Sequence, residues 1–112
     1  MKKEEIKINV KGDRSIVNSI NLVRIGKFWH FGLIYVFGNA CGGNPFEESV
    51  KFETKDAALL AGLYELQGLH TEALSSAGDP LYNYKRKYIE NVISAIKDMA
   101  VTVKNRIAET GS

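Results

Sequence analysis

Residues 28–37, FWHFGLIYVF, place the strictest limit on how this chain folds. If the segment is a strand, its odd-numbered side chains face one way and its even-numbered side chains face the other. Both sets are largely apolar, from Trp29 and Phe31 on one face to Ile34 and Val36 on the other. We therefore expect the central strand of an antiparallel sheet, covered by helices on one face and by a partner on the other.

Three shorter segments carry the other strand patterns. Residues 6–10 alternate between apolar and polar, which is the period of a half-buried strand. Residues 20–25 form a second strand, and a tight turn at residues 26–27 joins it to the aromatic strand. A glycine-rich loop follows the aromatic strand, and residues 50–52 mark a short fourth strand.

The second half of the chain predicts two helices. Residues 54–74 begin with Thr54, a good N-cap, and carry leucines at helical spacing. Gly62 weakens this helix and would let a neighbouring element approach closely. Residues 79–108 begin with an Asp-Pro pair and contain no internal glycine or proline, which predicts a helix of roughly 40 Å.

These patterns predict an α+β fold, with an antiparallel sheet of about four strands followed by two helices, the C-terminal one long. The sheet occupies residues 1–53 and the helices residues 54–74 and 79–108. A chain of 112 residues suits a single domain, residues 1–112.

Charge and cysteine content restrict the classes of binding partner and the cellular location that we expect. The chain has 15 basic and 13 acidic residues and a net charge of +2, which is too balanced for strong non-specific binding of nucleic acid. Cys41 is the single cysteine and cannot form an intramolecular disulfide, which favours a reducing, cytoplasmic location. The longest apolar run is far too short to cross a bilayer, so we expect no membrane partner.

No residue pattern indicates an enzyme. Cys41 lies in the glycine loop, but no motif places His30 or His70 beside it. His30 is more typical of a packed sheet histidine than of a ligand or base. No spacing resembles a metal site, a P-loop or a dinucleotide motif. We expect no catalytic residue, no metal and no cofactor.

The first candidate binding site combines the aromatic strand with its loop. Trp29 could stack on a base, and the backbone amides of Asn39, Gly42 and Gly43 could surround an anion. The alternative is that the aromatic residues pack in the core and the glycines form a hairpin loop.

The second candidate is YNYKRKY at residues 82–88. Tyr82 and Tyr84 could stack or hydrogen-bond while Arg86 and its basic neighbours meet phosphate. The alternative is a solvated helix face, with tyrosines packing inward and Arg86 pairing with Glu90.

Arg24 and Arg106 are further candidates, because arginine suits bidentate phosphate contact. Arg24 lies within a strand, so it must either reach the sheet edge or pair. Val101 falls near the polar side of the last helix, which indicates either self-association or a lone surface apolar residue.

The order of an aromatic strand (FWHFGLIYVFG), a glycine loop and FETKDAALLAGLYEL resembles small sheet-then-helix proteins of phages and mobile elements, over residues 20–108. Some of these accompany partition-type DNA-binding proteins. Others are the Thoeris anti-defence "sponge" proteins, which sequester cyclic nucleotide immune signals. The resemblance implies a sheet plus two helices, oligomers and ligand sites between subunits, and it transfers no site residue.

The leading functional hypothesis is a non-enzymatic, homo-oligomeric binding protein that sequesters an anionic, nucleotide-like small molecule and so counters host defence. One alternative is a protein-interaction inhibitor of a host enzyme. The other alternative is a DNA-binding accessory protein. The low net charge favours a small ligand over long nucleic acid as the partner.

Overall fold

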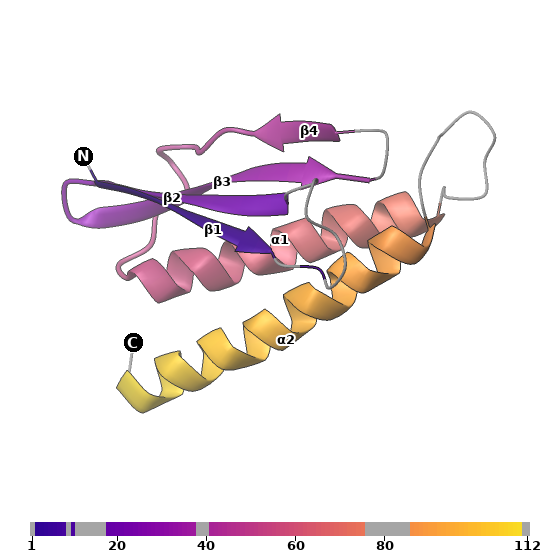
Figure 1. The fold of residues 1–112 in the computed structure, drawn as a ribbon. Coiled ribbons are helices and arrows are strands. Elements are labelled where there is room, and N and C mark those ends of the chain that lie inside the picture. Colours follow the sequence, from indigo (N-terminus) through magenta and orange to yellow (C-terminus); the bar gives the residue numbers. More distant parts are fainter. Residues whose placement is uncertain (1, 9, 11–17, 38–40, 76–85, 111–112) are drawn as a thin grey trace.

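The computed structural model describes residues 2–8, 10, 18–37, 41–75 and 86–110 (Figure 1). Its elements are β1 (Lys2–Ile8), β2 (Asn18–Ile25), β3 (Phe28–Val36), β4 (Cys41–Asn44), α1 (Lys55–Ser75) and α2 (Arg86–Thr110). The strands form one antiparallel sheet in the order β1-β2-β3-β4, and both helices lie on the same face of it. This confirms the predicted α+β fold, including a long C-terminal helix of 25 residues.

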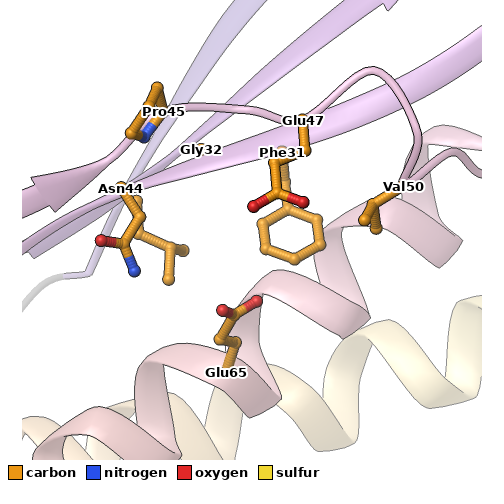
Figure 2. A pocket seen from close by; sticks show the side chains of 8 residues that line it. Phe31, Gly32, Asn44, Pro45, Glu47, Val50 and Glu65 are labelled. Atoms are coloured by element: carbon orange, nitrogen blue, oxygen red, sulfur yellow. The ribbon is translucent and has the colours of Figure 1, made fainter.

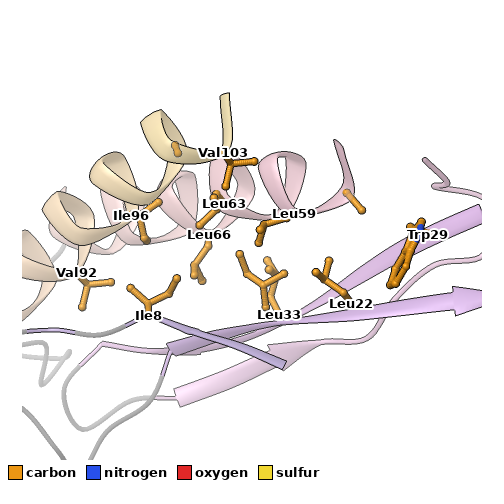
Figure 3. Close-up of a cluster of buried hydrophobic side chains, with 13 residues drawn as sticks. Ile8, Leu22, Trp29, Leu33, Leu59, Leu63, Leu66, Val92, Ile96 and Val103 are labelled. Carbon is orange, nitrogen blue, oxygen red and sulfur yellow. The ribbon is translucent and has the colours of Figure 1, made fainter. Parts of the chain in front are cut away.

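The core lies between the helices and the inner face of β2 and β3 (Figure 3). Ile20 and Leu33 face each other in the β2–β3 register and are fully buried. Leu63 of α1 and Ile96 of α2 are fully buried in the same cluster. β3 lies between β2 and β4 in the sheet, so the aromatic strand is a central strand, as its two apolar faces predict.

The outer face of β3 is partly covered by the chain itself. Phe46, in the segment after β4, packs against His30 with ring centroids 5.7 Å apart. His30 is buried, whereas Ile34 on the same face is 41% exposed. The expected cover on this face is thus supplied in part by residues 45–51 rather than by a partner.

The fourth strand does not lie where the sequence predicts it. β4 occupies Cys41–Asn44, inside the expected glycine loop, and pairs with β3 from Leu33 to Val36. Pairing then stops and resumes at Phe52, which forms an isolated bridge with Trp29. The prediction of a strand at residues 50–52 is therefore wrong except for this bridge, because residues 45–51 leave the edge of the sheet. We call residues 45–51 the edge excursion.

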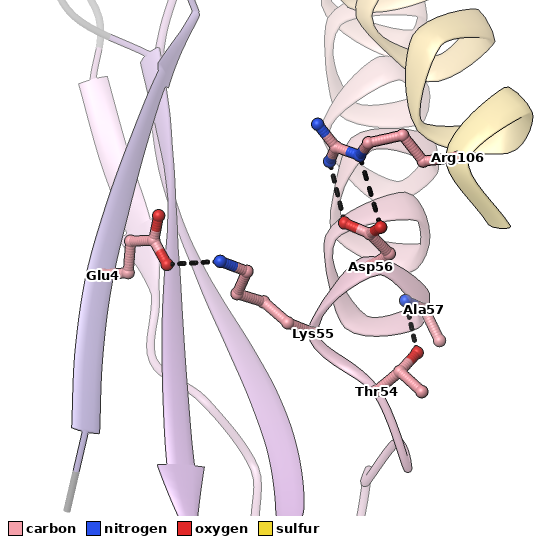
Figure 4. A network of polar contacts seen from close by, with 6 residues as sticks. All are labelled: Glu4, Thr54, Lys55, Asp56, Ala57 and Arg106. Carbon is pink, nitrogen blue, oxygen red and sulfur yellow. Dashed lines mark hydrogen bonds and ion pairs between the residues drawn. The ribbon is translucent and has the colours of Figure 1, made fainter. Parts of the chain in front are cut away.

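α1 starts where the sequence predicts it and packs directly on the sheet (Figure 4). The Ala57 N–H donates to Thr54 Oγ1 over 3.1 Å, so Thr54 is the N-cap. A Cβ on Gly62 would lie 3.0 Å from Ile20 Cγ2 and 3.3 Å from a ring carbon of Phe31. Gly62 therefore permits the close approach of α1 to the sheet, as predicted.

α2 runs antiparallel to α1 and completes the helical layer (Figure 1). The predicted start of the long helix, residues 79–85, lies outside the described residues. Val101 is 58% exposed, on the polar side where the sequence places it. Among the described residues, no helix has the length and apolar character needed to span a membrane.

A buried polar cluster closes the core at the end of β3, and we call it the sealed end. Fully buried Asn18 accepts from the Val36 N–H over 2.8 Å and donates to Tyr88 Oη over 2.8 Å. His70 of α1, also fully buried, contacts the carbonyl oxygens of Val36 at 3.2 Å and Leu66 at 3.0 Å. These contacts join β2, β3, α1 and α2, and every buried side-chain polar atom in the described part of the chain lies within hydrogen-bond distance of a partner.

Candidate functional site: a pocket beneath the edge excursion

Trp29 and Arg24 occupy one end of the sheet. Trp29 is only 9% exposed and belongs to the core cluster, so its ring packs inside the protein. Its backbone N–H and C=O bond to Phe52 over 2.8 and 2.9 Å. Arg24 is the direct neighbour of Trp29 in the β2–β3 register, and its side chain is exposed. No ion pair of Arg24 occurs within the described ranges.

Gly42 and Gly43 lie in β4 rather than in a loop. A Cβ on Gly42 would lie 2.8 Å from three atoms of the Tyr35 ring system, so this glycine makes room for the tyrosine. A Cβ on Gly43 would lie 3.2 Å from the Leu33 carbonyl oxygen. Both glycines pair with β3 through the strand register. Asn39, the third member of the predicted anion loop, lies outside the described residues.

The two arginines of α2 that the sequence predicts as ligand-binding residues both lie beside acidic side chains. Arg86 lies 4.0 Å from Glu90 at i,i+4, the pairing that the solvated-face alternative predicts. Arg106 binds Asp56 of α1 with two hydrogen bonds, over 2.7 and 3.2 Å (Figure 4). The two arginines are 20 positions apart along α2, so they do not meet. Tyr82 and Tyr84 lie outside the described residues.

A pocket that combines an aromatic ring with two carboxylates lies between the edge excursion and α1, apart from the residues that the sequence predicts as binding residues (Figure 2). It has a volume of about 240 Å³. Its lining residues are Phe31, Gly32, Leu33, Asn44, Pro45, Glu47, Val50 and Glu65. Phe31 from β3 forms one wall, and Glu47 and Glu65 approach it from the excursion and from α1.

His30 fixes the edge excursion in place. Its Nδ1 lies 3.2 Å from the Glu47 carbonyl oxygen and 3.0 Å from the Val50 carbonyl oxygen. Both partners are acceptors, so Nδ1 carries the proton and donates to both. The Val50 N–H in turn donates to the Glu47 carbonyl over 3.1 Å, which closes a turn. The buried histidine therefore holds the backbone that presents the Glu47 carboxylate.

Gly32 lets the excursion cross close to β3. A Cβ at this position would lie 3.0 Å from the Asn44 carbonyl oxygen and 3.1 Å from the Phe46 nitrogen. Both neighbours are backbone atoms, which cannot rotate away as a side chain can. Gly32 and Gly62 thus allow the excursion and α1 to approach β3 on either side of the pocket.

The pocket is acidic. Among the described residues, Glu47 and Glu65 are the only charged ones that line it, and no basic side chain of that set does so. None of the ion pairs between described residues involves either carboxylate. Phe31 is half-buried and tilts against Phe52, with ring centroids 5.9 Å apart. An aromatic wall with two nearby carboxylates suits a cationic group, which gains from the ring's π-face and from charge-assisted hydrogen bonds.

Sequence reasoning missed this pocket. The sequence pattern singles out neither Glu47 nor Glu65. The two carboxylates are 18 positions apart in the sequence, and only the fold brings them to one pocket. The single usable signal was His30, a polar residue within an apolar strand. No group of three or more His, Cys, Asp or Glu side chains suited to a metal occurs within the described ranges.

Comparisons of the chain with protein-family models, with curated proteins and with solved structures found no match.

Proposed function

We propose that this chain is a non-enzymatic protein-interaction module whose pocket beneath the edge excursion receives a lysine or arginine side chain of a partner protein. The observation that carries the proposal is the pair of carboxylates, Glu47 and Glu65, that line the same pocket beside Phe31 without an ion pair among the described residues. The sequence alone already offers a protein-interaction role as an alternative. The proposal adds the location of the binding site and the positive charge of the group that it binds.

The size of the pocket supports a side chain rather than a larger ligand. Its volume of about 240 Å³ lies below the roughly 300–1,000 Å³ typical of pockets for drug-sized molecules. An alkylammonium or guanidinium group enters such a space along its apolar stem, which Leu33 and Val50 can contact. The charged end then meets the carboxylates near solvent, where an ion pair needs little desolvation.

The charge of the bound group can be tested without knowing the partner. Nα-acetyl-lysine amide and Nα-acetyl-arginine amide are titrated into isotope-labelled protein, and the neutral Nα-acetyl-norleucine amide serves as the matched ligand. We expect saturable, millimolar shifts at the amides of Phe31, Val50 and Glu65 with the cations and none with norleucine.

Matched variants separate the pocket from general surface charge. Glu47→Gln and Glu65→Gln should each weaken cation binding by about threefold to tenfold, the range for one charged hydrogen bond near solvent. Glu48→Gln and Glu72→Gln remove the same charge from exposed positions outside the pocket lining and should leave binding unchanged. Equal shifts with norleucine, or no saturable shift with either cation, would exclude the proposed site.

The second candidate function is sequestration of an anionic, nucleotide-like ligand. Arg24 favours it: the side chain is exposed, it has no ion pair within the described chain, and Lys2 is its cross-strand neighbour. Calorimetry against cyclic nucleotides and ADP-ribose isomers tests this function. Heat that Arg24→Ala abolishes and Lys97→Ala preserves would support it. No heat with any member of the panel would remove it.

A further inference from the structure

β1 is an edge strand whose outer side has no strand partner in the described chain. It pairs with β2 from Lys2 to Ile8, and the sheet order places no described strand beyond it. Unpaired backbone N–H and C=O groups at such an edge can accept a further strand. The question is therefore which strand this edge fits.

An open groove runs beside this edge, between β1 and the helices. Its volume is about 520 Å³. Ile6 contributes the strand wall, and Ala95, Met99 and Val103 of α2 contribute apolar contacts. Ile6 is only half-buried, so the groove leaves part of this side chain uncovered. A strand added to β1 would place alternate side chains over this apolar surface.

The charge pattern of β1, KKEEIKI, selects one way of pairing with a second copy. In an antiparallel pair related by a two-fold axis through the sheet, the central residue faces itself. Centres at Lys2, Lys3, Glu4, Glu5 or Lys7 would place two like charges directly opposite each other, which is unfavourable. A centre at Ile8 would need residues beyond the end of β1. Ile6 is the remaining centre.

With Ile6 at the axis, no two like charges within β1 face each other. Glu5 of each copy faces Lys7 of the other, which gives two opposite-charge pairs on the outer face of the sheet. The two Ile6 side chains meet on the inner face, in the groove. Glu5 and Lys7 are exposed in the described chain, and neither has an ion pair within it.

The exposed side of α2 agrees with this arrangement. Asp98 lines the groove, and Val101 lies three residues further along, on the same side of the helix. Val101 is 58% exposed. Joining two sheets at β1 places the two α2 helices next to each other across the axis. Val101 then faces the partner's helix.

From these observations we infer that two copies of this chain associate through their β1 strands, with Ile6 opposite Ile6, to form one continuous eight-stranded antiparallel sheet. The inference does not depend on the proposed function. β1 and the edge excursion lie at opposite edges of the sheet, so both pockets of the dimer stay open and face away from the seam.

A charge exchange tests the interface. Sedimentation equilibrium should show a dimer for the unaltered chain. Glu5→Lys or Lys7→Glu alone creates two like-charge pairs and should raise the dimer dissociation constant by at least about tenfold. The double variant Glu5→Lys with Lys7→Glu restores both pairs and should return the constant to within about threefold. Glu72→Lys makes the same charge change as Glu5→Lys, away from β1, and should have no effect.

A cross-link tests the register. Paired residues of antiparallel strands have Cα atoms about 4.5–5.5 Å apart, within the range that a disulfide spans. In a Cys41→Ser background, Ile6→Cys should form a dimer under mild oxidation, whereas Lys3→Cys should not. A chain that stays monomeric at millimolar concentration, a dimer indifferent to both single charge changes, or a double variant that is not restored would overturn the inference. So would equal cross-linking at positions 3 and 6.

Discussion

His30 and His70 are both buried and both contact two backbone carbonyls, yet they do so in different ways at two different ends of the molecule. His30 directs Nδ1 alone at the carbonyls of Glu47 and Val50, which a neutral ring satisfies with one N–H. His70 directs one nitrogen at Leu66 and the other at Val36, so a neutral ring can donate to only one of them. The first histidine holds a surface excursion, and the second lies within the sealed end.

The polar groups near the two histidines also differ, in whether they are bonded to one another or left open to a ligand. At the sealed end, Asn18, Tyr88 and the Val36 backbone satisfy one another inside the core. Beneath the edge excursion, Glu47 and Glu65 line an open pocket without an ion pair among the described residues. A closed polar network stabilises a fold, whereas charged groups left without a partner at a pocket are available to a ligand. This difference is why we place the binding site at the excursion.

The largest effect should come from breaking the sealed end. Asn18→Ala removes two hydrogen bonds and leaves the buried Val36 N–H without its acceptor. We expect a loss of roughly 2–4 kcal/mol in the free energy of unfolding, because each orphaned buried group costs about 1–3 kcal/mol. Urea denaturation at neutral pH measures it. Asn91→Ala, on the exposed side of α2, should change the free energy by less than about 0.5 kcal/mol. Equal effects of the two substitutions would contradict the structural role of Asn18.

Two glycines of α1 offer a matched comparison of the contact between this helix and the sheet with exposed helix surface. A Cβ on Gly68 meets nothing within 4 Å, so Gly68→Ala should stabilise the protein by about 0.5–1 kcal/mol through helix propensity. Gly62→Ala gains the same propensity but crowds Ile20 and Phe31. Overpacking costs about 1–3 kcal/mol, so Gly62→Ala should be the less stable variant by that difference. Equal unfolding free energies would show that α1 does not need to approach the sheet so closely.

Removing the anchor of the excursion should weaken ligand binding more than it weakens the fold. His30→Ala removes the histidine donor from two carbonyls of the excursion, of which the Glu47 carbonyl still accepts from the Val50 N–H, and this costs about 1–2 kcal/mol in stability. Cation binding should fall by about tenfold, because Glu47 loses its fixed position. His30→Asn keeps a donor near Nδ1 and should recover much of the binding in the same amide titration. Unaltered binding in His30→Ala would mean that the excursion holds its shape without the histidine.

The smallest effect concerns pH at the sealed end. Burial lowers the pKa of His70 below its ordinary value of 6.5, and this outweighs the two carbonyl contacts, which act to raise it. The unfolded chain therefore binds more protons than the folded chain as the pH falls through about 6.5, so stability decreases toward lower pH. Urea denaturation at pH 7.5 and 5.5 should show a smaller decrease in His70→Gln than in the unaltered chain. An equal or larger decrease in the variant would contradict this sign.

The sequence predicted the architecture because the fold follows from local periodicity. The alternation in β1 and β2, the two-sided apolar pattern of β3 and the capped, leucine-rich helix α1 each depend on neighbouring residues. β4 could not be predicted in this way. Within β4, position 42 needs a glycine because the side chain of Tyr35 lies against it, and that contact arises only in the folded chain.

The candidate site was harder to predict, because residue type does not show which charges are already paired. Arg106 has the right chemistry for a phosphate, but in the fold it donates two hydrogen bonds to Asp56 of the other helix. The ring of Trp29 could stack on a base if it were exposed, but it is buried in the core. Conversely, Glu65 is an ordinary exposed helix residue until the excursion brings Glu47 to the same pocket. Which charges are paired is a property of tertiary structure.

The most direct test of our central claim is the sign of the charge that the excursion pocket binds. One isotope-labelled sample of the unaltered chain is titrated with Nα-acetyl-lysine amide, and a second with a cyclic dinucleotide. We predict saturable shifts at Phe31, Val50 and Glu65 with the cation and no change at these amides with the anion. Saturable shifts at these residues with the anion and none with the cation would contradict the account.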